Sequence, residues 1–516
     1  MDNRLISKIL NQGEGNKMKI VNIMNFARKS DFRIEDSENY LFNTTKTELE
    51  LVNQYGYENT FLLQYDALID PRYIELFKTE ATEKTELGLW YEIVRPLTNA
   101  VGLAWRSKEN SDWDWHIVPG FSQAYTQEER ERLADAAMNK FKEIYGYYPK
   151  TIASWMIDSY TILYLSEHYD ISTFAICRDQ TSTDAYTFVG GYFNQAYYPS
   201  KMNVFTPAQT DECRINVPVF RLLGPDPIHN YDSNKYLVNE KYLPYRDCYT
   251  LEPVFRSGYD EEIVNWFFDT YFKNEDLGFS YAQLGQENSF GIKKIKDGLC
   301  LQMELLKEFP DVTVEKMSDT GERFKKAYKN TPPTSVCALN DWDGSDRVQS
   351  VYYDCQNYTA NIFRFNNKIF IRCMYLFDES VCESYYDKPC ETWDATYENL
   401  PITDTLLWED DSGIVLDTNA TAFSVCKNEN GDLEVYWEDK KVIFSEDSVA
   451  MFNVTPDFCI KGAGADIILK NNKLCYEYKG NKYALNAVTG TMSANDDHIY
   501  FKPQDGCIRL IFERKE

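Results

Sequence analysis

The fold is decided by the stretch FKEIYGYYPKTIASWMIDSYTILYLSEHYDI, which covers residues 141–171. Its first residues end an amphipathic helix at Gly146, and glycine commonly closes a helix. The apolar run 151–158 follows and predicts a buried strand that ends at Asp158. Helical spacing then resumes beyond this strand. A helix, a strand and a second helix in this order indicate a βα unit of a parallel sheet.

The same alternation of apolar runs with helical segments extends from residue 19 to about residue 315. One helical segment opens at Thr126 with Glu129 three residues later, the pattern of a capping box, and another closes at Gly56. Seven runs predict strands, at 19–26, 59–66, 85–93, 151–158, 172–179, 214–223 and 278–285. We therefore expect an N-terminal α/β domain that forms a (β/α)7 barrel.

The pattern changes past about residue 318. A helical, proline-containing stretch is followed from Val336 by short strands with turns such as NENG, KGN and QDG, which are typical of hairpins. An all-β, antiparallel β-sandwich is the simplest interpretation. The expected organisation is an N-terminal extension (1–17), a (β/α)7 catalytic barrel (18–317), a helical linker (318–335) and a β-sandwich domain (336–516).

The charge of the chain argues against two classes of partner. Lys and Arg number 54 against 81 Asp and Glu, which gives a formal net charge of −27. A charge of this sign repels phosphate backbones and anionic lipid, so we expect neither a nucleic acid nor a membrane partner. The N-terminus has no basic segment followed by a long apolar run, which favours the cytoplasm. The sequence leaves the oligomeric state open.

Aromatic residues make up 15% of the chain, with 38 Tyr and 10 Trp. Such residues either stack on the apolar faces of sugars or belong to a large core and to sheet surfaces, where Tyr is common. The excess as a whole favours a carbohydrate ligand.

Most catalytic motifs are missing from the sequence. Among the four His, which are His116, His168, His229 and His498, there is no HxH, HxxxH or HExxH pairing. The 13 Cys contain no CxxC pair. The sequence also has no GxSxG elbow, no Walker A motif and no GxGxxG after a strand. We therefore expect no metal and no cofactor.

Carboxylates supply the remaining chemistry. Glycoside hydrolysis needs one protonated carboxyl group for the leaving oxygen and one ionised group that attacks carbon or activates water. Glu287 suits the acid, because Gly285 lets the backbone come close; the alternative for Glu287 is a capping loop. Asp158 follows an apolar strand beside Trp155, and its alternative is the N-cap of the next helix. Asp158 and Glu287 are the predicted catalytic residues.

Other polar or aromatic residues lie at strand ends or in the loops that follow them, where a parallel barrel builds its site. Each of them has the alternative of a helix cap or a packed loop. The candidate substrate-binding residues are Arg28, Asp66, Glu92, Trp113, His116, Trp155, Asp179, Gln283 and Gln286.

Three segments resemble the polysaccharide-deacetylase-like barrels. They are TKTELELVNQYGYENTFLL (45–63), TELGLWYEI (85–93) and the opening stretch 141–171. In that superfamily a helix that ends in YG precedes a strand, and a GxxPxxxR pattern leads into a later helix. The resemblance covers about residues 19–290 and implies a seven-stranded barrel that acts on carbohydrate.

The chain departs from this superfamily at the metal positions. NFARKSD (25–31) replaces the carboxylates of the first strand, and Glu92 with Arg95 stands where the superfamily has paired histidines. These replacements argue against a metal-dependent deacetylase. The same barrel occurs in the retaining glycosidases of family 57, and family 38 combines a related barrel with a β-sandwich.

Similarity to family 57 implies a nucleophile at the end of the fourth strand and an acid/base at the end of the seventh. Those positions are Asp158 and Glu287, with the Asp and the Glu exchanged relative to that family. We therefore expect a glycoside hydrolase that cleaves an oligo- or polysaccharide. The alternatives are a non-catalytic carbohydrate-binding protein on a degenerate deacetylase barrel, and a carbohydrate deacetylase with an unrecognised metal site.

Overall fold

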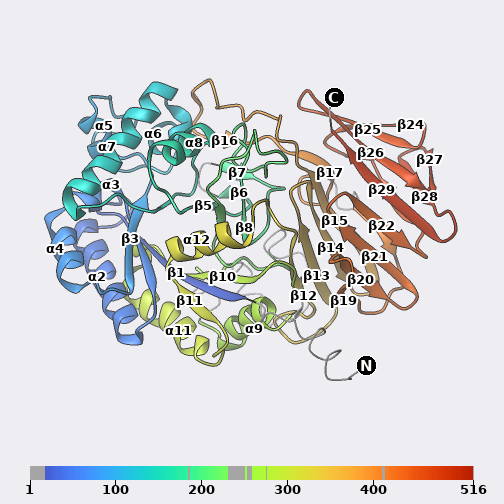
Figure 1. Cartoon of the computed structure of the whole chain (residues 1–516), viewed down its shortest axis with the longest axis horizontal. Helices are drawn as coiled ribbons and strands as arrows, with labels where there is room; N and C mark the ends of the chain where they lie inside the picture. Colours follow the sequence, from blue (N-terminus) through green and yellow to red (C-terminus); the bar gives the residue numbers. More distant parts are fainter. Residues whose placement is uncertain are drawn as a thin grey trace, which may run out of the picture.

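The computed structural model describes residues 18–183, 186–229, 250–252, 259–274, 276–408 and 413–514. The expected N-terminal extension, 1–17, lies outside them. Two parts lie side by side: a helix-rich part formed by the first half of the chain, and a part made of long antiparallel strands (Figure 1). None of the helices in these ranges is both long and apolar enough to cross a membrane.

The first part is built on parallel strands in the order β10-β1-β2-β3-β4-β5-β9. Their bounds are β1 (Lys19–Ala27), β2 (Asn59–Leu63), β3 (Thr85–Trp90), β4 (Thr151–Ala153), β5 (Thr173–Cys177), β9 (Val219–Leu222) and β10 (Ser280–Leu284). The sheet curls until Gly224, just after β9, donates a hydrogen bond of 3.3 Å to the carbonyl of Gln283 at the opposite edge. The predicted seven strands and the α/β barrel class are confirmed.

Helices surround this sheet (Figure 1). They are α2 (Ser37–Tyr55), α3 (Tyr65–Leu68), α4 (Pro71–Glu80), α5 (Arg95–Ala100), α6 (Ile117–Gly120), α7 (Gln127–Tyr145), α8 (Ser159–His168), α9 (Glu261–Phe272), α10 (Gly291–Lys294) and α11 (Cys300–Leu306). The predicted capping box at Thr126 and Glu129 is present at the start of α7. Gly56 and Gly146 close α2 and α7 with φ values of 71° and 86°, the left-handed conformation that favours glycine.

Short elements complete the barrel. They are the strands β6 (Gln180–Thr183), β7 (Tyr186–Phe188), β8 (Ala196–Tyr197) and β11 (Thr313–Glu315), the 3-10 turns η1 (Ser122–Ala124) and η4 (Asn288–Phe290), and the π-helical turn η5 (Ile295–Leu299). β8 pairs with β9 in the antiparallel sense, and β11 adds to the N-terminal half of β1.

Helix α12 (Met317–Ala327) closes the barrel at the N-terminal ends of its strands. Met317 and Phe324 pack with the aromatic side chains of the barrel interior, which include Phe26 and Trp90. A Cβ on Gly321 would lie 2.5 Å from the carbonyl oxygen of Ser172, so only glycine fits at this contact with the start of β5. The helical segment expected between the two domains thus packs against the barrel.

The second part consists of two antiparallel sheets. One contains β12 (Thr334–Ala338), β13 (Val348–Asp354), β14 (Tyr358–Phe365), β15 (Lys368–Leu376), β17 (Leu400–Asp404), β18 (Ile414–Asp417), β23 (Asp457–Cys459), β27 (Thr491–Asn495) and β28 (His498–Lys502). The other contains β19 (Ser424–Lys427), β20 (Leu433–Trp437), β21 (Lys440–Ser445), β22 (Ser448–Phe452), β24 (Asp466–Lys470), β25 (Lys473–Tyr478), β26 (Asn481–Thr489) and β29 (Cys507–Glu513). Apolar side chains from both sheets share one core, as a sandwich requires, and the predicted all-β class is confirmed.

One segment of the second part reaches back to the barrel. Residues 378–399, here called the clasp, connect β15 with β17 and include β16 (Ala395–Thr396), which pairs with β7. The clasp accepts a backbone hydrogen bond from Ile117 at the start of α6 and donates one to Gln123 in η1. The loops on one side of the barrel are therefore held in place by the second part of the chain.

Candidate active site

Three charged side chains from different strands meet at the C-terminal mouth of the barrel. Arg28 follows β1, Glu92 follows β3 and Glu287 follows β10. Arg28 Nη2 donates to Glu287 Oε2 at 3.0 Å; the arginine side chain is 1% exposed and the glutamate side chain 13%. Burial opposes the charge on Arg28, but Glu287 and Glu92 raise its pKa above the ordinary value. We call Arg28, Glu92 and Glu287 the mouth cluster.

The two oxygens of Glu92 have different surroundings. Oε2 accepts hydrogen bonds from Gln64 Nε2 and, at 2.8 Å, from Trp113 Nε1. Oε1 is buried and, like Trp90 Nε1, makes no hydrogen bond of ordinary geometry among the described residues, but Trp90 is close enough to favour the charged form of Glu92. Burial raises the pKa of Glu92 to about 7, against the opposing effects of Arg28 and Trp113. Glu92 therefore carries a proton in part of the molecules near neutral pH, and Oε1 is the oxygen left to hold it.

Further polar atoms at the mouth are buried and unpaired. Within the described ranges, Asn25 Nδ2, Gln64 Oε1 and both terminal atoms of Gln286 have no hydrogen-bond partner. These residues lie at the ends of β1, β2 and β10, next to the mouth cluster. Buried polar groups in folded proteins are nearly always paired. Several unpaired donors and acceptors at one place indicate a site for a polar ligand.

Gly285 and Asn288 hold Glu287 beside Arg28. Gly285 has a φ of 117°, and a Cβ there would lie 1.9 Å from the carbonyl oxygen of Met24, so only glycine lets β10 approach β1 this closely. The Asn288 side chain donates to the carbonyl oxygen of Arg28 at 2.7 Å and accepts from its N–H at 3.3 Å. The amide of Asn288 is therefore a structural link between the two strand ends.

Asp66 positions the loop that carries Arg28. Its Oδ2 accepts from the backbone N–H groups of Lys29 and Ser30, both at 3.1 Å. Burial raises the pKa of Asp66 to about 6, although these hydrogen bonds favour the charged form. Asp66 thus acts on the mouth cluster through the backbone of the loop.

Glu48 is an acidic residue near the site that was not among the sequence candidates. It lies on the buried face of α2 with Thr44 and Val52, and neither of its oxygens has a hydrogen-bond partner in the described part of the chain. Burial raises the pKa of Glu48 well above its usual range, and the charge of Glu287 adds to this effect. The spacing is a usable signal, because Glu48 stands four residues from Val52 and one from Leu49, on the face of α2 that is buried and carries no other charged residue.

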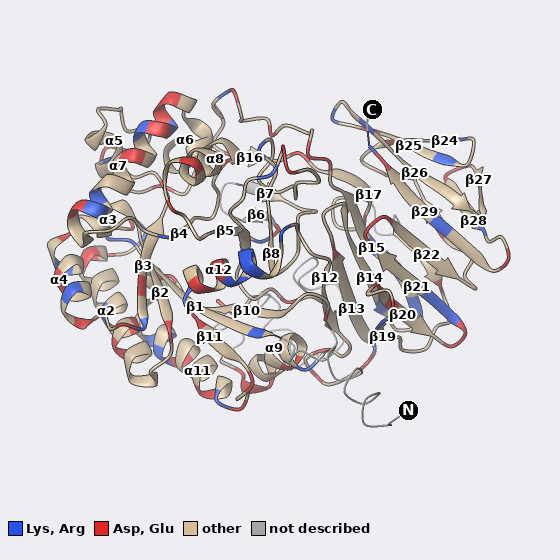
Figure 2. Cartoon of the chain, viewed as in Figure 1, with Lys and Arg blue, Asp and Glu red and all other residues tan. Residues whose placement is uncertain are grey.

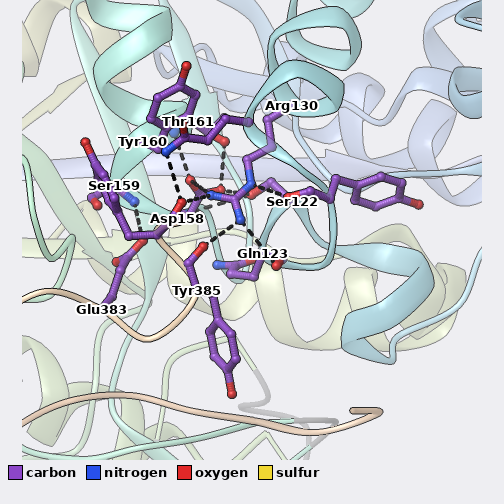
Figure 3. Close-up of polar contacts among 12 residues, drawn as sticks. Ser122, Gln123, Arg130, Asp158, Ser159, Tyr160, Thr161, Glu383 and Tyr385 are labelled. Atoms are coloured by element: carbon purple, nitrogen blue, oxygen red, sulfur yellow. Dashed lines mark hydrogen bonds and ion pairs between the residues drawn. The ribbon is translucent and has the colours of Figure 1, made fainter. Parts of the chain in front are cut away.

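Asp158 lies in a different cluster (Figure 3). It is the N-cap of α8, and Oδ1 accepts from Thr161 N and from Arg130 Nη1, both at 2.9 Å. Oδ2 accepts from the hydroxyl groups of Ser122 and Thr161. The side chain has no exposed surface, and each oxygen already accepts two hydrogen bonds. These contacts match the helix-cap alternative for Asp158.

The clasp adds a second carboxyl group next to Asp158. Glu383 Oε1 accepts from Ser159 N at 2.9 Å, and Oε2 accepts from Val204 N at 3.3 Å. Burial and the nearby charge of Asp158 raise the pKa of Glu383. Arg130 binds the clasp as well, through the carbonyl oxygen of Tyr385 at 2.6 Å. We call Arg130, Asp158 and Glu383 the clasp cluster.

Some of the other residues predicted from the sequence contact the mouth cluster, and others lie elsewhere. Trp113 contacts the mouth cluster, with the Arg28 guanidinium 4.1 Å from the centroid of its ring. Trp155 packs edge-on against Trp90 in the aromatic layer of the barrel interior. His116 begins α6, where its Nδ1 lies 2.6 Å from Asp114 Oδ1.

Asp179 and Gln283 contact neither Arg28 nor Glu287. Asp179 accepts from the backbone N–H groups of Gly190 and Gly191 and forms an ion pair of 2.8 Å with Arg221. Gln283 Nε2 donates to the hydroxyl of Tyr281 at 2.7 Å, deep in the barrel on the side of α12. The structure thus brings Arg28, Asp66, Glu92, Trp113, Gln286 and Glu287 together, and it places Asp158, Asp179 and Gln283 elsewhere.

The arrangement of possible metal ligands and the comparisons with known proteins complete the description of the site. Within the ranges given above, no group of three or more His, Cys, Asp or Glu is arranged to hold a metal ion. Residues 29–335 match the model of a family described as "Domain of Unknown Function with solved-structure structure (DUF3863)". A comparison with curated proteins gave no match.

Several solved structures are similar to the chain. A "putative glycoside hydrolase/deacetylase" from Parabacteroides distasonis has a TM-score of 0.54 and 16% identity, over 74% of this chain and 90% of that one. A "putative polysaccharide deacetylase" from Mycobacterium smegmatis has a TM-score of 0.35 and 14% identity, over 62% and 94%. A 4-alpha-glucanotransferase from Thermococcus litoralis has a TM-score of 0.32 and 9% identity, over 96% and 98%. The expected fold is confirmed by the first of these structures, whose TM-score exceeds 0.5.

Proposed function

The chain belongs to the DUF3863 family, and we propose that it is a glycoside hydrolase that cleaves an oligo- or polysaccharide with Glu92 and Glu287. The observation that carries this proposal is the unequal pair of carboxyl groups beside Arg28. Glu92 has a raised pKa and an unpaired buried oxygen, and Glu287 is held in an ion pair. Two carboxyl groups kept in different protonation states are what glycoside hydrolysis requires.

In this mechanism Glu92 is the acid. The proton on Oε1 passes to the glycosidic oxygen as the bond between that oxygen and the anomeric carbon breaks. Gln64 and Trp113 hold the other oxygen and so fix the direction in which the proton points. Loss of the proton leaves a carboxylate that Arg28 stabilises. If Glu287 attacks the anomeric carbon, Glu92 then takes a proton from the water molecule that releases the sugar from Glu287. If Glu287 is instead the base for the attacking water, Glu287 takes that proton and Glu92 regains its own from solvent.

Glu287 is the ionised partner. Its ion pair with Arg28 orients the carboxyl group, and its side chain is 13% exposed. The carboxylate either attacks the anomeric carbon or removes a proton from the attacking water. The unpaired polar atoms of Asn25 and Gln286 supply donors and acceptors for sugar hydroxyl groups.

The proposal keeps Glu287 from the sequence-based pair and assigns Glu92 in place of Asp158. Each oxygen of Asp158 already accepts two hydrogen bonds from the protein, so neither has capacity left for a substrate. Glu92 follows a neighbouring strand and shares Arg28 with Glu287. The fold of the chain supports a carbohydrate substrate, because the similar barrel with a TM-score of 0.54 carries a name of that class.

The test begins with a screen of aryl glycosides and neutral oligosaccharides. On the best substrate, Glu92→Gln should lower kcat by about 10²- to 10⁴-fold, the usual contribution of a positioned acid. Glu50→Gln is the matched control, because Glu50 is an exposed glutamate of α2 that is far more accessible than Glu92. Equal turnover by Glu92→Gln and by the control would refute the assignment of the acid.

The pH dependence of kcat provides a second readout. The acid must carry its proton, so kcat should fall as the pH rises through about 7, the pKa of Glu92. Glu92→Gln should lose this dependence. Release of acetate from acetylated glycans, with the glycan chain left intact, would instead favour a deacetylase. Binding of glycans by the wild type without any turnover would favour a carbohydrate-binding protein.

A further inference from the structure

A row of aromatic rings runs outward from the candidate site. We call Trp113, Trp115, Phe32, His116 and Trp393 the aromatic strip. The ring centroids of Trp113 and Trp115 lie 6.1 Å apart, those of Trp115 and His116 4.9 Å, and those of His116 and Trp393 4.8 Å. Phe32 stacks on Trp115 at 5.3 Å with an interplanar angle of 20°. Each ring thus contacts another member of the strip.

The outer rings of the strip are exposed. Phe32 is 42% exposed and Trp393 is 51% exposed, and the side chain of His116 is 32% exposed. Trp113, at the inner end, is buried. Single exposed aromatics are ordinary, but adjoining exposed rings form a patch that binds something. The gradient from a buried ring to exposed rings gives the strip a direction, from the barrel mouth to the surface.

The inner end of the strip is continuous with the candidate site. Trp113 Nε1 donates to the acid Glu92 at 2.8 Å, and the Arg28 guanidinium lies over the face of the same ring. Arg33 covers part of Trp113 and Trp115, with its guanidinium carbon 4.8 Å and 5.4 Å from the two centroids. The buried inner end of the strip is therefore in direct contact with the mouth cluster.

The outer end of the strip is supplied by the second part of the chain. Trp393 belongs to the clasp, and its carbonyl oxygen accepts a hydrogen bond of 3.0 Å from Ile117 N, next to His116. This contact fixes the backbone and leaves the indole ring half exposed. The two parts of the molecule thus build one surface, and the barrel alone lacks its outermost ring.

We propose that the aromatic strip is a run of sugar-binding subsites for a neutral oligosaccharide or polysaccharide that extends away from the mouth cluster. The inference rests on the proposed function and adds the class of substrate. Aromatic rings offer flat apolar surfaces that stack on the apolar faces of pyranose rings. The exposed ring surface of the strip is on Trp393 and Phe32, because Arg28 and Arg33 lie over Trp113 while Phe32 and His116 stack on Trp115.

Charge favours a neutral chain over a polyanionic one. The formal net charge is −27, and acidic side chains are distributed over both parts of the molecule (Figure 2). Around the strip itself the acids Asp112 and Asp114 are balanced by Arg28, Arg33 and Lys108, which lie over its rings, so the sign of the field on approach is set by the charge of the whole chain. A glycan with many carboxylate or sulfate groups would be repelled on approach.

Binding can be tested without turnover. Glu287→Gln protein is run in native gels that contain soluble starch, mixed-linkage glucan, xylan or galactomannan, and retardation measures the affinity. We expect at least one of these polysaccharides to retard the protein. Adding Trp393→Ala should weaken that affinity about 10-fold, which corresponds to about 1.4 kcal/mol. Phe32→Ala should have a similar effect.

The matched control is Tyr500→Ala, which removes an aromatic ring of comparable exposure from the sandwich. This variant should bind as tightly as its parent. The strip is refuted if no neutral polysaccharide retards the protein, or if Trp393→Ala and Tyr500→Ala bind equally well. If the wild type shows no turnover on any substrate but polysaccharide still retards the protein through Trp393, the aromatic strip is supported and the hydrolase proposal is refuted.

Turnover gives a second measure if a substrate is found. The ratio of kcat/KM for a hexasaccharide to kcat/KM for the disaccharide of the same sugar should fall about 10-fold in Trp393→Ala. A structural role of Trp393 would lower both values together and leave the ratio unchanged, which would contradict the proposal.

Discussion

Arg28 and Arg130 are both buried arginines that lie among carboxyl groups. At the mouth of the barrel, Arg28 pairs with Glu287 and is near Glu92. Under the clasp, Arg130 pairs with Asp158 and is near Glu383. In each cluster the glutamate that is not in the ion pair, Glu92 or Glu383, has a raised pKa.

The difference lies in what each cluster has left to bind. Both oxygens of Asp158 and both oxygens of Glu383 accept hydrogen bonds from the protein itself. Glu92 has one unpaired oxygen, and Glu287 reaches partly into solvent. Charge, burial and a raised pKa therefore do not separate a site from a structural cluster. What differs between these two clusters is the state of their carboxyl oxygens: those of the mouth cluster keep capacity that a ligand needs, and those of the clasp cluster are used by the protein.

The largest effect should follow from Glu287→Gln. The amide cannot serve as the ionised partner, so we expect kcat to fall by about 10²- to 10⁴-fold. Stability should change less than it does when Arg130 loses its partner, because Glu287 reaches solvent and Arg28 keeps an ion pair of 3.6 Å with Asp31. Steady-state kinetics and thermal unfolding of the same preparation measure both quantities. Full activity in this variant would remove Glu287 from the mechanism.

The next largest effect should come from Asp158→Asn, and it should appear in stability. The substitution leaves Arg130 buried without its ion-pair partner, which costs about 3 kcal/mol of unfolding free energy. Denaturant titration measures this loss. Activity per folded molecule should persist. A variant with normal stability and no turnover would show instead that Asp158 is the catalytic partner of Glu287.

Glu383→Gln should change the pH dependence of stability. The folded state raises the pKa of Glu383, so it binds the proton more tightly than the unfolded state does. Stability from this group is therefore highest at acidic pH and falls as the pH rises from the ordinary glutamate range through neutrality. Comparison of unfolding free energies between about pH 5 and pH 8 should show a shallower decline in the variant than in the wild type. Identical slopes would mean that Glu383 is ionised throughout this range.

The smallest effect should follow from Trp113→Phe. This change removes the 2.8 Å hydrogen bond that favours the charged form of Glu92. We expect the pKa of Glu92 to rise, and the alkaline limb of the kcat profile to move upward by about one pH unit. A limb that stays in place would mean that another group controls it.

Most of the fold could be read from the sequence. The seven strands and the two glycine helix ends follow from local patterns, because each depends on residues close together in the chain. The packing of α12 against the barrel could not be read this way. Its apolar residues Met317 and Phe324 predict a helix, but the surface that they cover is set by strands hundreds of residues earlier.

The site could be predicted only in part, for the same reason. Arg28, Glu92 and Glu287 all lie at ends of parallel strands, where a barrel brings such residues together. The predicted strand 151–158 places Asp158 at such an end too, but β4 ends at Ala153 and Asp158 is the N-cap of α8. What distinguishes it is the set of donors around it, which come from the Ser122 hydroxyl and Arg130, and these partners cannot be identified from the residues beside Asp158.

The clasp makes the two halves of the molecule poor candidates for exchange by recombination. A break near residue 335, where the barrel ends in the sequence, would separate Arg130 and Ser159 from the clasp residues that bind them. A new partner domain could replace the sandwich only if it brought an equivalent of residues 378–399. The barrel and the sandwich therefore have to be exchanged together, although each has a hydrophobic core of its own.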